Sequence, residues 1–253
     1  MSRYKVIIEY DGTPFHGWQR QEGYDSVQQR VEEAMLPFLK KSVPLHCAGR
    51  TDAGVHALGQ VAHFDFNEDL DCFRLQECMN FYLTDVPICI LSIEKVPNNF
   101  HARLSPIERS YVYKILNRRG KATIDANRVW VVSAMLDEKK MHSAAQCLVG
   151  KHDFSSFRSA GCQQKSPIKT VNSISIERYG NLIEITISAK SFLYHQVRNI
   201  VGSLRFVGCG KWSEDDFRSV FEAKDRTLAG PTAPACGLYF IGAKFSDNNL
   251  AEK

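Results

Sequence analysis

The sequence lacks a long apolar run, and this absence limits the kind of protein it encodes. A membrane-spanning helix needs about 20 consecutive apolar residues, and no uninterrupted stretch of even ~18 occurs in this chain. The alternating pattern that begins at Tyr4 follows Met1 almost directly, so the start has no apolar region of the secretory kind. We therefore expect a cytoplasmic protein with no membrane attachment.

Cysteine is present, but without the spacing that metal and redox sites use. The eight cysteines include no C-x2-C pair and no accompanying histidines at zinc-ligand spacing. The sequence therefore predicts no metal and no cofactor, and we expect reduced, mostly buried thiols. The cysteines are Cys47, Cys72, Cys78, Cys89, Cys147, Cys162, Cys209 and Cys236.

The chain has little excess charge of either sign, so its composition permits a nucleic-acid partner without requiring one. The formal net charge is +4 over 253 residues, of which 44% are hydrophobic. That is enough to bury a substantial core in one large domain or two smaller ones. The charge is uneven, because residues 101–130 hold seven basic and two acidic side chains. This segment is either a stripe that follows phosphates or a solvated strand face.

Periodicity predicts two successive α+β units, with neither a flexible linker nor an internal repeat between them. Ser26 and Gln29 form a capping-box signal for the first helix, and Pro37 predicts that this helix bends or stops near Leu36. Junctions containing proline divide the chain into halves 1–104 and 105–253. Other elements are expected as strands at 4–10, 43–49, 59–66, 87–96, 109–117 and 237–245, a hairpin across 171–190 turning at 179–181, and helices at 73–83, 138–149, 193–208 and 213–224.

The segment 47–56 has the composition of an active-site loop. Asp52 follows a strand-like stretch and precedes Gly54, which can turn the chain sharply because glycine adopts positive φ at little cost. Loops held by a rigid scaffold often carry chemistry. The alternative for an isolated Asp-x-Gly is a turn in which Asp52 only accepts hydrogen bonds from the backbone ahead of it.

Asp52 is not part of an isolated Asp-x-Gly, because the residues around it form a longer recognisable motif. Gly49-Arg50-Thr51-Asp52-Ala53-Gly54-Val55-His56, followed by Gly59-Gln60-Val61, resembles the signature of the tRNA pseudouridine synthase A family. The resemblance extends over almost the whole chain and keeps the order of its blocks. The other blocks are Glu9-Tyr10-Asp11-Gly12, Gly17-Trp18-Gln19-Arg20-Gln21, Phe100-His101-Ala102-Arg103, Tyr111-Val112-Tyr113, His152-Asp153-Phe154-Ser155-Ser156-Phe157, Val197-Arg198-Asn199-Ile200-Val201-Gly202 and Gly237-Leu238-Tyr239-Phe240.

The resemblance implies an architecture and a reaction. The fold would be α+β, with two ferredoxin-like (RRM-like) halves whose antiparallel sheets lie side by side around a central active-site cleft. The first half would carry the catalytic Asp loop, and the second would carry the tyrosine and arginine of the cleft. The enzyme would isomerise uridine to pseudouridine at positions 38, 39 and 40 of the tRNA anticodon stem-loop. It would work as a homodimer without a cofactor.

Three residues are expected to act at the reacting nucleotide. Asp52 would attack ribose C1′ as a nucleophile or remove the C2′ proton, and the sequence leaves both open. Because a desolvated carboxylate is costly unless paired, an arginine should hold it, and the resemblance implies Arg198. Periodicity alone would make Arg198 a helix-surface residue; Gly202 on the same face would let another backbone come close. Tyr111 would stack on the target base; the alternative is that Tyr111 and Tyr113 together build one face of a sheet.

Other side chains are expected to contact RNA. Arg50, close to Asp52, would touch a phosphate or keep the base displaced. The loop after the first strand would grip RNA through Trp18, Gln19 and Arg20, or else Trp18 would point inward as a hydrophobic plug. The remaining candidates are Arg103 and Arg205, and we expect His56, His63 and His101 to be structural or RNA-contacting rather than metal ligands.

Three functions are compatible with these residues. The resemblance implies an isomerase acting on tRNA uridines. A non-catalytic RNA-binding module is the second, and the intact set of Asp52, Tyr111 and Arg198 argues against it. A hydrolase would combine Asp52 with another carboxylate, for which the sequence offers no convincing candidate near the loop.

Overall fold

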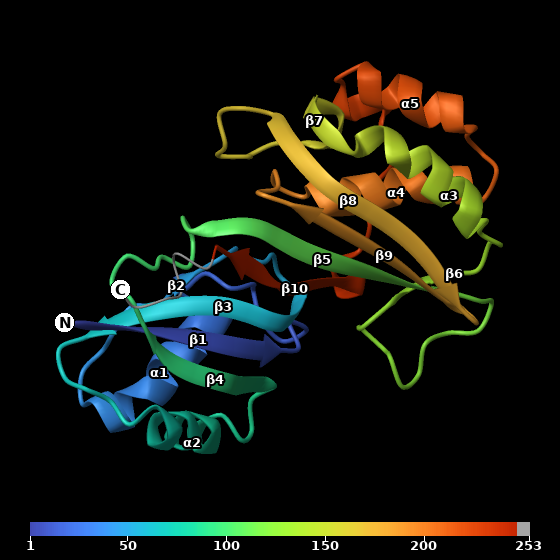
Figure 1. Cartoon of the computed structure of the whole chain (residues 1–253). Coiled ribbons are helices and arrows are strands. Elements are labelled where there is room, and N and C mark those ends of the chain that lie inside the picture. Colours follow the sequence, from blue (N-terminus) through green and yellow to red (C-terminus); the bar gives the residue numbers. More distant parts are fainter. Residues whose placement is uncertain (247–253) are drawn as a thin grey trace. The chain divides into compact units, whose positions relative to one another are not determined.

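The computed structural model describes residues 1–246, which divide into two compact units (Figure 1). Of the described residues, the first unit comprises Met1–Arg109 and 239–246, and the second comprises Ser110–Leu238. The division follows Arg109, five residues after the end of the predicted first half. The last strand also joins the first unit, because its residues pair with a strand of that unit. Residues 247–253 of the predicted second half lie outside the described residues.

The first unit is built on a mostly antiparallel sheet in the order β4-β1-β3-β10. Strand β1 (Ser2–Tyr10) pairs antiparallel with β3 (His56–Phe66) and with β4 (Ile88–Val96). The short β2 (His46–Cys47) pairs antiparallel with β3, and β10 (Leu238–Phe245) pairs parallel with it. The predicted alternation of the first strand is confirmed, since Tyr4, Val6 and Ile8 are completely buried.

Two helices cover one face of this sheet, α1 (Val27–Leu39) and α2 (Cys72–Tyr82) (Figure 1). The Ser26 side chain caps α1 by accepting a hydrogen bond from the Gln29 backbone N–H. This is half of the predicted capping box, since the Gln29 side chain donates to Glu33 at 2.8 Å. Pro37 does not stop α1 near Leu36, because the helix continues to Leu39 and ends only where Lys40 adopts a left-handed conformation.

The strand predicted at 43–49 is reduced to the two residues of β2. Pro44 has no N–H to donate to a neighbouring strand, and the Leu45 N–H donates instead to the carboxylate of Glu32, 3.0 Å away on α1. The segment that leads to Asp52 is therefore fastened to a helix rather than to a full strand ladder.

The second unit has an antiparallel sheet in the order β5-β9-β8-β7. Its strands are β5 (Pro106–Asn117), β7 (Gly150–Asp153), β8 (Ile168–Tyr179) and β9 (Leu182–Ala189), and the short β6 (Trp130–Val132) runs parallel to β5. The first four residues of β5 belong to the first unit. The predicted hairpin is confirmed: β8 and β9 pair antiparallel, and Gly180 turns the chain with φ +60°.

The helices of the second unit are α3 (Glu138–Ala145), α4 (Gln196–Gly208) and α5 (Glu214–Glu222), with short 3-10 turns at Gln146–Leu148, Ser155–Phe157, Arg226–Leu228 and Ala235–Gly237. Helix α4 begins later than the predicted residue 193, because His195 has a left-handed backbone with φ 60°. Helix α5 begins with a capping box formed by Ser213 and Asp216. Phe157 stacks with Phe217 and Phe221 in the core beneath these helices. Each unit thus combines helices with a largely antiparallel sheet, so the α+β class is confirmed.

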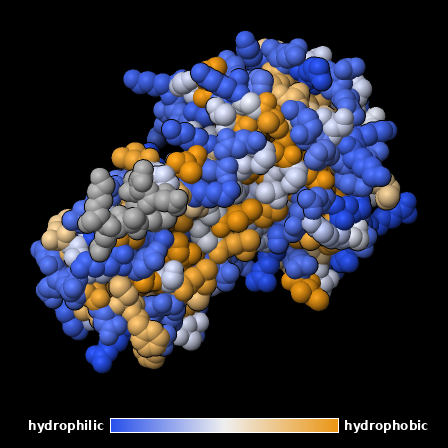
Figure 2. All heavy atoms as spheres, in the orientation of Figure 1, coloured by the Kyte–Doolittle hydropathy of each residue, from blue (hydrophilic) through white to orange (hydrophobic). Residues whose placement is uncertain are grey.

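The surface in Figure 2 is mostly hydrophilic, with apolar side chains scattered between polar ones. The expectation of mostly buried thiols is wrong. None of the eight cysteines, all of which lie in the described chain, forms a disulfide, but only Cys47 is buried, while Cys89 and Cys209 are exposed and the other five are half-buried. Cys89 lies at an outward position of β4 and Cys209 at the end of α4. Among residues 1–246, no helix is long and apolar enough to cross a membrane.

Candidate active site

Asp52 lies in the tight loop between β2 and β3. Its side chain is half-buried, and its backbone carbonyl accepts a hydrogen bond from the Val55 N–H at 3.1 Å. Gly54 turns the chain inside this loop with φ +74°, a conformation that costs other residues steric strain. The predicted glycine turn is therefore present, and Asp52 lies where it begins.

A second loop, residues 11–18, packs directly against the backbone of the Asp52 loop. The Trp18 N–H donates to the Thr51 carbonyl at 3.0 Å. Two glycines allow this approach. A Cβ on Gly17 would lie 2.6 Å from the Thr51 carbonyl oxygen, and one on Gly12 would lie 2.0 Å from that of Val55. No larger residue fits at either position without moving the Asp52 loop.

Buried polar side chains hold the Asp52 loop from beneath. The hydroxyl groups of Tyr10 and Thr51 are 2.8 Å apart, and Gln60 Nε2 donates to the Gly49 carbonyl at 2.7 Å. Both Tyr10 and Gln60 are inaccessible to solvent. Burial raises the pKa of Tyr10 well above its ordinary value, so its phenol stays neutral and acts as a hydrogen-bonding group.

His56 also contributes to the shape of this region rather than to an exposed site. Its ring is buried, stacks on Tyr239 with centroids 4.6 Å apart, and accepts a hydrogen bond at Nδ1 from the Gly12 N–H. This contact joins the loop at 11–18 to the first residue of β3. It agrees with the structural interpretation of this histidine.

Trp18 points into the protein, whereas a residue that stacks on RNA needs an exposed ring face. Its side chain is 1% exposed and lies against Tyr10, with ring centroids 6.1 Å apart. The alternative in which Trp18 points inward therefore fits, because no face of the indole is open to a base. Trp18 serves to anchor the loop that supports Asp52.

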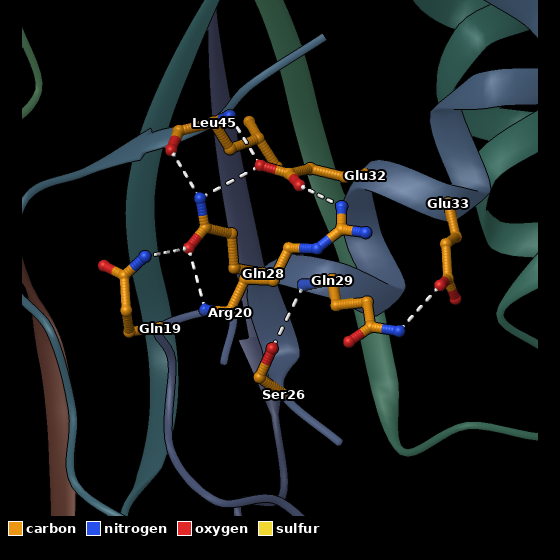
Figure 3. A network of polar contacts seen from close by, with 8 residues as sticks. All are labelled: Gln19, Arg20, Ser26, Gln28, Gln29, Glu32, Glu33 and Leu45. Atoms are coloured by element: carbon orange, nitrogen blue, oxygen red, sulfur yellow. Dashed lines mark hydrogen bonds and ion pairs between the residues drawn. The ribbon is translucent and has the colours of Figure 1, made fainter. Parts of the chain in front are cut away.

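The two residues after Trp18 reach the surface. Gln19 is half-buried, whereas the Arg20 side chain is 53% exposed. Both are hydrogen-bonded to side chains of α1 (Figure 3). They remain candidates for contact with a ligand from solvent.

Arg50 and Arg103 are exposed cations near the same buried thiol. Burial raises the pKa of Cys47 to about 12, and both arginines act in the opposite direction through their charge. Sequence reasoning missed the contribution of Arg109, which donates from Nε to the Ala48 carbonyl at 2.8 Å and from Nη2 to the Arg103 carbonyl at 2.6 Å. It thereby ties the segment before Asp52 to residue 103. Its only sequence signal was membership of the basic segment 101–130.

Tyr111 lies on β5 in the second unit and is half-buried. Its ring meets that of Phe192 edge-on, with centroids 5.2 Å apart and an interplanar angle of 90°. Tyr113 is fully buried and donates its hydroxyl to the Pro234 carbonyl at 2.8 Å. The two tyrosines therefore differ in accessibility although they share a strand parity. Phe192 carried no recognisable signal in the sequence.

Arg198 is half-buried on α4 and lies against the segment 231–233. Its Nε donates to the Ala233 carbonyl at 2.8 Å, while the Ala233 N–H donates to the Arg198 carbonyl at 3.1 Å. The close backbone approach predicted at Gly202 is confirmed, since a Cβ there would lie 1.7 Å from the Pro231 carbonyl oxygen. The guanidinium is thus fixed by backbone contacts within its own unit.

Arg205 lies about two turns further along α4 than Arg198 and is half-buried. Its guanidinium carbon is 5.8 Å from the ring centroid of Trp130 and 5.9 Å from that of Phe206. In the described part of the chain its Nε is buried without a hydrogen-bond acceptor.

The predicted residues fall into two sets, one in each unit. The first unit holds Asp52, Arg50, Arg103, Trp18, Gln19 and Arg20, and the second holds Tyr111, Arg198 and Arg205. Within residues 1–246, no group of three or more His, Cys, Asp or Glu side chains is arranged to hold a metal ion. In the first set, one half-buried carboxylate lies on a loop that is held by hydrogen bonds from the loop 11–18 and from Gln60.

Comparisons with known proteins identify the family. A family model described as tRNA pseudouridine synthase matches residues 6–104 and 144–246. The tRNA pseudouridine synthase A of Rhodospirillum centenum is 51% identical over 96% of this chain and 99% of the relative. The proteins of the same name from Paramagnetospirillum magneticum and Maricaulis maris are 48% and 46% identical, over 97% of this chain and over 96% and 98% of the relatives.

The chain belongs to the tRNA pseudouridine synthase family and is an isomerase. The resemblance found from residues 49–61 and the predicted enzyme class are thereby confirmed. Asp52 and Arg198 lie inside the segments that the family model matches, whereas Tyr111 lies between them.

Proposed function

We propose that this protein isomerises uridine to pseudouridine at positions 38, 39 and 40 of the tRNA anticodon stem-loop. The observation that carries the proposal is the Asp52 loop, whose sequence follows the family signature and whose backbone is fixed by the loop 11–18 and by Tyr10 and Gln60. A catalytic carboxylate must be held in its reactive position before the substrate arrives. This loop supplies such a scaffold.

The reaction exchanges one glycosidic bond for another. The bond between ribose C1′ and N1 of uracil breaks, the base rotates within the site, and C1′ joins C5, which then loses its hydrogen as a proton. Asp52 acts at the ribose, either by attacking C1′ to give a covalent ester or by removing the C2′ proton to give a glycal. Both routes balance without an oxidant or a reductant, and both need an ionised Asp52.

Two residues of the second unit complete the proposed chemistry. Arg198 pairs with Asp52 and keeps it ionised, since a carboxylate in a desolvated site is costly without a cation. Tyr111 stacks on the target base. Its half-buried ring, braced edge-on by Phe192, supports that role.

The fold and the assembly are proposed on the same family resemblance. Each unit is a ferredoxin-like (RRM-like) half, and the two antiparallel sheets lie side by side around a central cleft. The element order β1-α1-β2-β3-α2-β4 of the first unit supports the proposal. The enzyme acts in the cytoplasm as a homodimer, and Gln19, Arg20, Arg50, Arg103 and Arg205 contact the tRNA.

Position mapping on anticodon stem-loop transcripts tests this function. Purified protein is incubated with transcripts that carry uridine at position 38, 39 or 40 in turn, and pseudouridine is located by nucleoside mass spectrometry after nuclease digestion. The proposal expects conversion at each of the three positions and none at uridines elsewhere in the loop. Binding without conversion would identify a non-catalytic RNA-binding module, and release of free uracil would identify a hydrolase.

A further inference from the structure

Glu32 is a buried carboxylate that the proposed reaction does not use. It lies on α1 with its side chain 7% exposed. One carboxylate oxygen accepts hydrogen bonds from Gln28 Nε2 and from the Leu45 N–H, both at 3.0 Å, and the other accepts from Arg20 Nη1 at 3.2 Å (Figure 3). Both oxygens are thus occupied, and one of them faces Arg20.

Gln28 extends this network to the backbone of the same loop. Its Oε1 accepts from Gln19 Nε2 at 2.9 Å and from the Arg20 N–H at 3.0 Å, while its Nε2 also donates to the Leu45 carbonyl at 3.2 Å (Figure 3). Gln28 and Glu32 stand one turn apart on α1, so they hold both the backbone and the side chain of Arg20.

The guanidinium of Arg20 is held on one side and open on the other. The described residues give Nη1 the carboxylate of Glu32 but give no acceptor to Nε or Nη2, and 53% of the side chain is exposed. An arginine with a planar fork of unused donors suits a phosphate group, which accepts two parallel hydrogen bonds. The ion pair with the buried Glu32 holds this fork toward solvent, so its geometry points to recognition.

We propose that Glu32 is a positioning residue for RNA binding, which orients Arg20 so that its free N–H groups meet a phosphate of the tRNA. This inference rests on the proposed function, because it takes RNA as the ligand of Arg20. Orienting the side chain in advance removes an ordering cost of binding. Loss of that orientation should weaken RNA binding about two- to tenfold, which corresponds to the ordering cost of one long side chain.

The test compares two adjacent carboxylates on the same helix. In Glu32→Gln, the amide has one acceptor oxygen where the network uses two, so its NH2 group must face either Arg20 or the pair formed by Gln28 and Leu45. Glu33→Gln is the matched control, because Glu33 is exposed and its carboxylate contacts only Gln29 and Arg30 in the described structure. Both changes remove one negative charge.

The direction of the change in RNA affinity distinguishes a positioning role of Glu32 from a general effect of its charge. Removing a negative charge should strengthen binding to a polyanion, and we expect Glu33→Gln to leave the affinity for an anticodon stem-loop RNA unchanged or slightly higher. We expect Glu32→Gln to weaken it about two- to tenfold despite the same change in charge. Dissociation constants are measured by fluorescence anisotropy across a series of KCl concentrations.

Arg20→Ala shows whether Glu32 acts through Arg20. This variant should lower the salt dependence, the slope of log K against log[KCl], by roughly 0.7–0.9, as expected for one lost phosphate contact. Adding Glu32→Gln to Arg20→Ala should then cause no further loss of affinity. The single-turnover rate at saturating RNA should fall less than the affinity in Glu32→Gln, because positioning of Arg20 acts on binding.

Several outcomes would overturn the inference. Wild-type affinity in Glu32→Gln, or an equal loss with and without Arg20, would make Glu32 a purely structural residue. If Glu32→Gln fails to fold, Glu32→Asp keeps the charge but draws the carboxylate back toward α1 and away from Arg20, and wild-type affinity in that variant would also reject the proposal. A wild-type protein that does not bind the RNA would overturn the proposed function itself, whereas the variant results above leave that function standing.

Discussion

The hydroxyl group of Tyr10 lies 2.8 Å from that of Thr51, the residue directly before Asp52. Gln60 Nε2 is 3.4 Å from the same Tyr10 hydroxyl and donates to the carbonyl of Gly49. Side chains from β1 and β3 therefore hold the two residues that flank Arg50, Gly49 by its carbonyl and Thr51 by its hydroxyl. The proposed catalytic carboxylate follows a segment that is anchored from the sheet below it.

Tyr10→Phe should lower the single-turnover rate of pseudouridine formation at saturating tRNA. The change leaves the buried Thr51 hydroxyl without this partner and should cost about 1–2 kcal/mol of stability. Tyr4→Phe is the control, because the Tyr4 hydroxyl is also hydrogen-bonded but to Glu68 and Leu70, away from Asp52. We expect Tyr4→Phe to lose stability without losing rate. Equal rate losses in the two variants, measured by rapid quench, would contradict a positioning role for Tyr10.

Gly17→Ala should lower the turnover rate more than the control substitution Gly23→Ala. Gly17 has φ +90°, and its added Cβ would lie 2.6 Å from the Thr51 carbonyl oxygen. Gly23 has φ +78° but nothing within 4 Å of its added Cβ, so Gly23→Ala should cost only backbone strain, about 1–2 kcal/mol. We expect at least a roughly tenfold lower turnover for Gly17→Ala, since a misplacement near 1 Å at a reacting group can cost about 10²-fold. Denaturant unfolding and turnover are measured for both variants.

The stability of the protein should rise with pH between about pH 4 and 6.5, in part because of His63. Its side chain is 1% exposed, and burial, followed by the charge of Arg3, lowers the pKa of His63 to about 4. The unfolded chain, with an ordinary histidine pKa near 6.5, therefore binds more protons than the folded chain in this window. That difference favours unfolding as the pH falls.

The variant His63→Asn should flatten this slope. Its amide oxygen can still accept the hydrogen bond that the Ala102 N–H donates to His63 Nδ1, but it does not titrate. His46→Asn changes an exposed histidine of the same cluster and serves as the control. Free energies of unfolding from urea titrations between pH 4 and 7 provide the measurement. A slope that responds equally to both changes would assign the effect to another group.

Arg198→Lys should impair catalysis more than binding. Lysine keeps the charge but not the planar, two-pronged contact with a carboxylate. In a double-mutant cycle with Asp52→Glu, which retains the carboxyl group, the combined loss of single-turnover rate should be much smaller than the sum of the single losses. Additive losses, or a change confined to tRNA affinity at fixed salt, would make Arg198 a phosphate contact.

Local signals in the sequence predicted much of the fold. The cap at Ser26, the alternation from Tyr4 and the hairpin around Gly180 each depend on residues within one turn or one strand, and the structure has all three. The start of α4 was predicted three residues too early, because His195 has a left-handed backbone. No pattern of residue types in the sequence predicts that conformation. The sequence also placed Asp52 on a loop correctly, because the signals for that loop, Gly54 and the neighbouring strand-like residues, lie close to Asp52 in the chain.

The supporting contacts of that loop were not predictable because they join residues far apart in the chain. In the sequence, Glu32 is indistinguishable from the other polar residues of an amphipathic helix. Its contacts with Leu45 and Arg20 form only in the folded chain. The same contact explains why the strand predicted at 43–49 is so short. The direction of Trp18 depends on the packing of its loop against Thr51, so residue type alone left it open.

The central claim is that Asp52 carries out the isomerisation, and the most direct test is tritium release from tRNA labelled at C5 of uridine. Formation of the C1′–C5 bond expels the C5 hydrogen, so wild-type protein should release tritium to water without an added cofactor. Asp52→Asn keeps the size of the side chain but removes its charge, and it should bind tRNA with nearly wild-type affinity while releasing none. Full release by a verified, homogeneous Asp52→Asn protein would contradict the account.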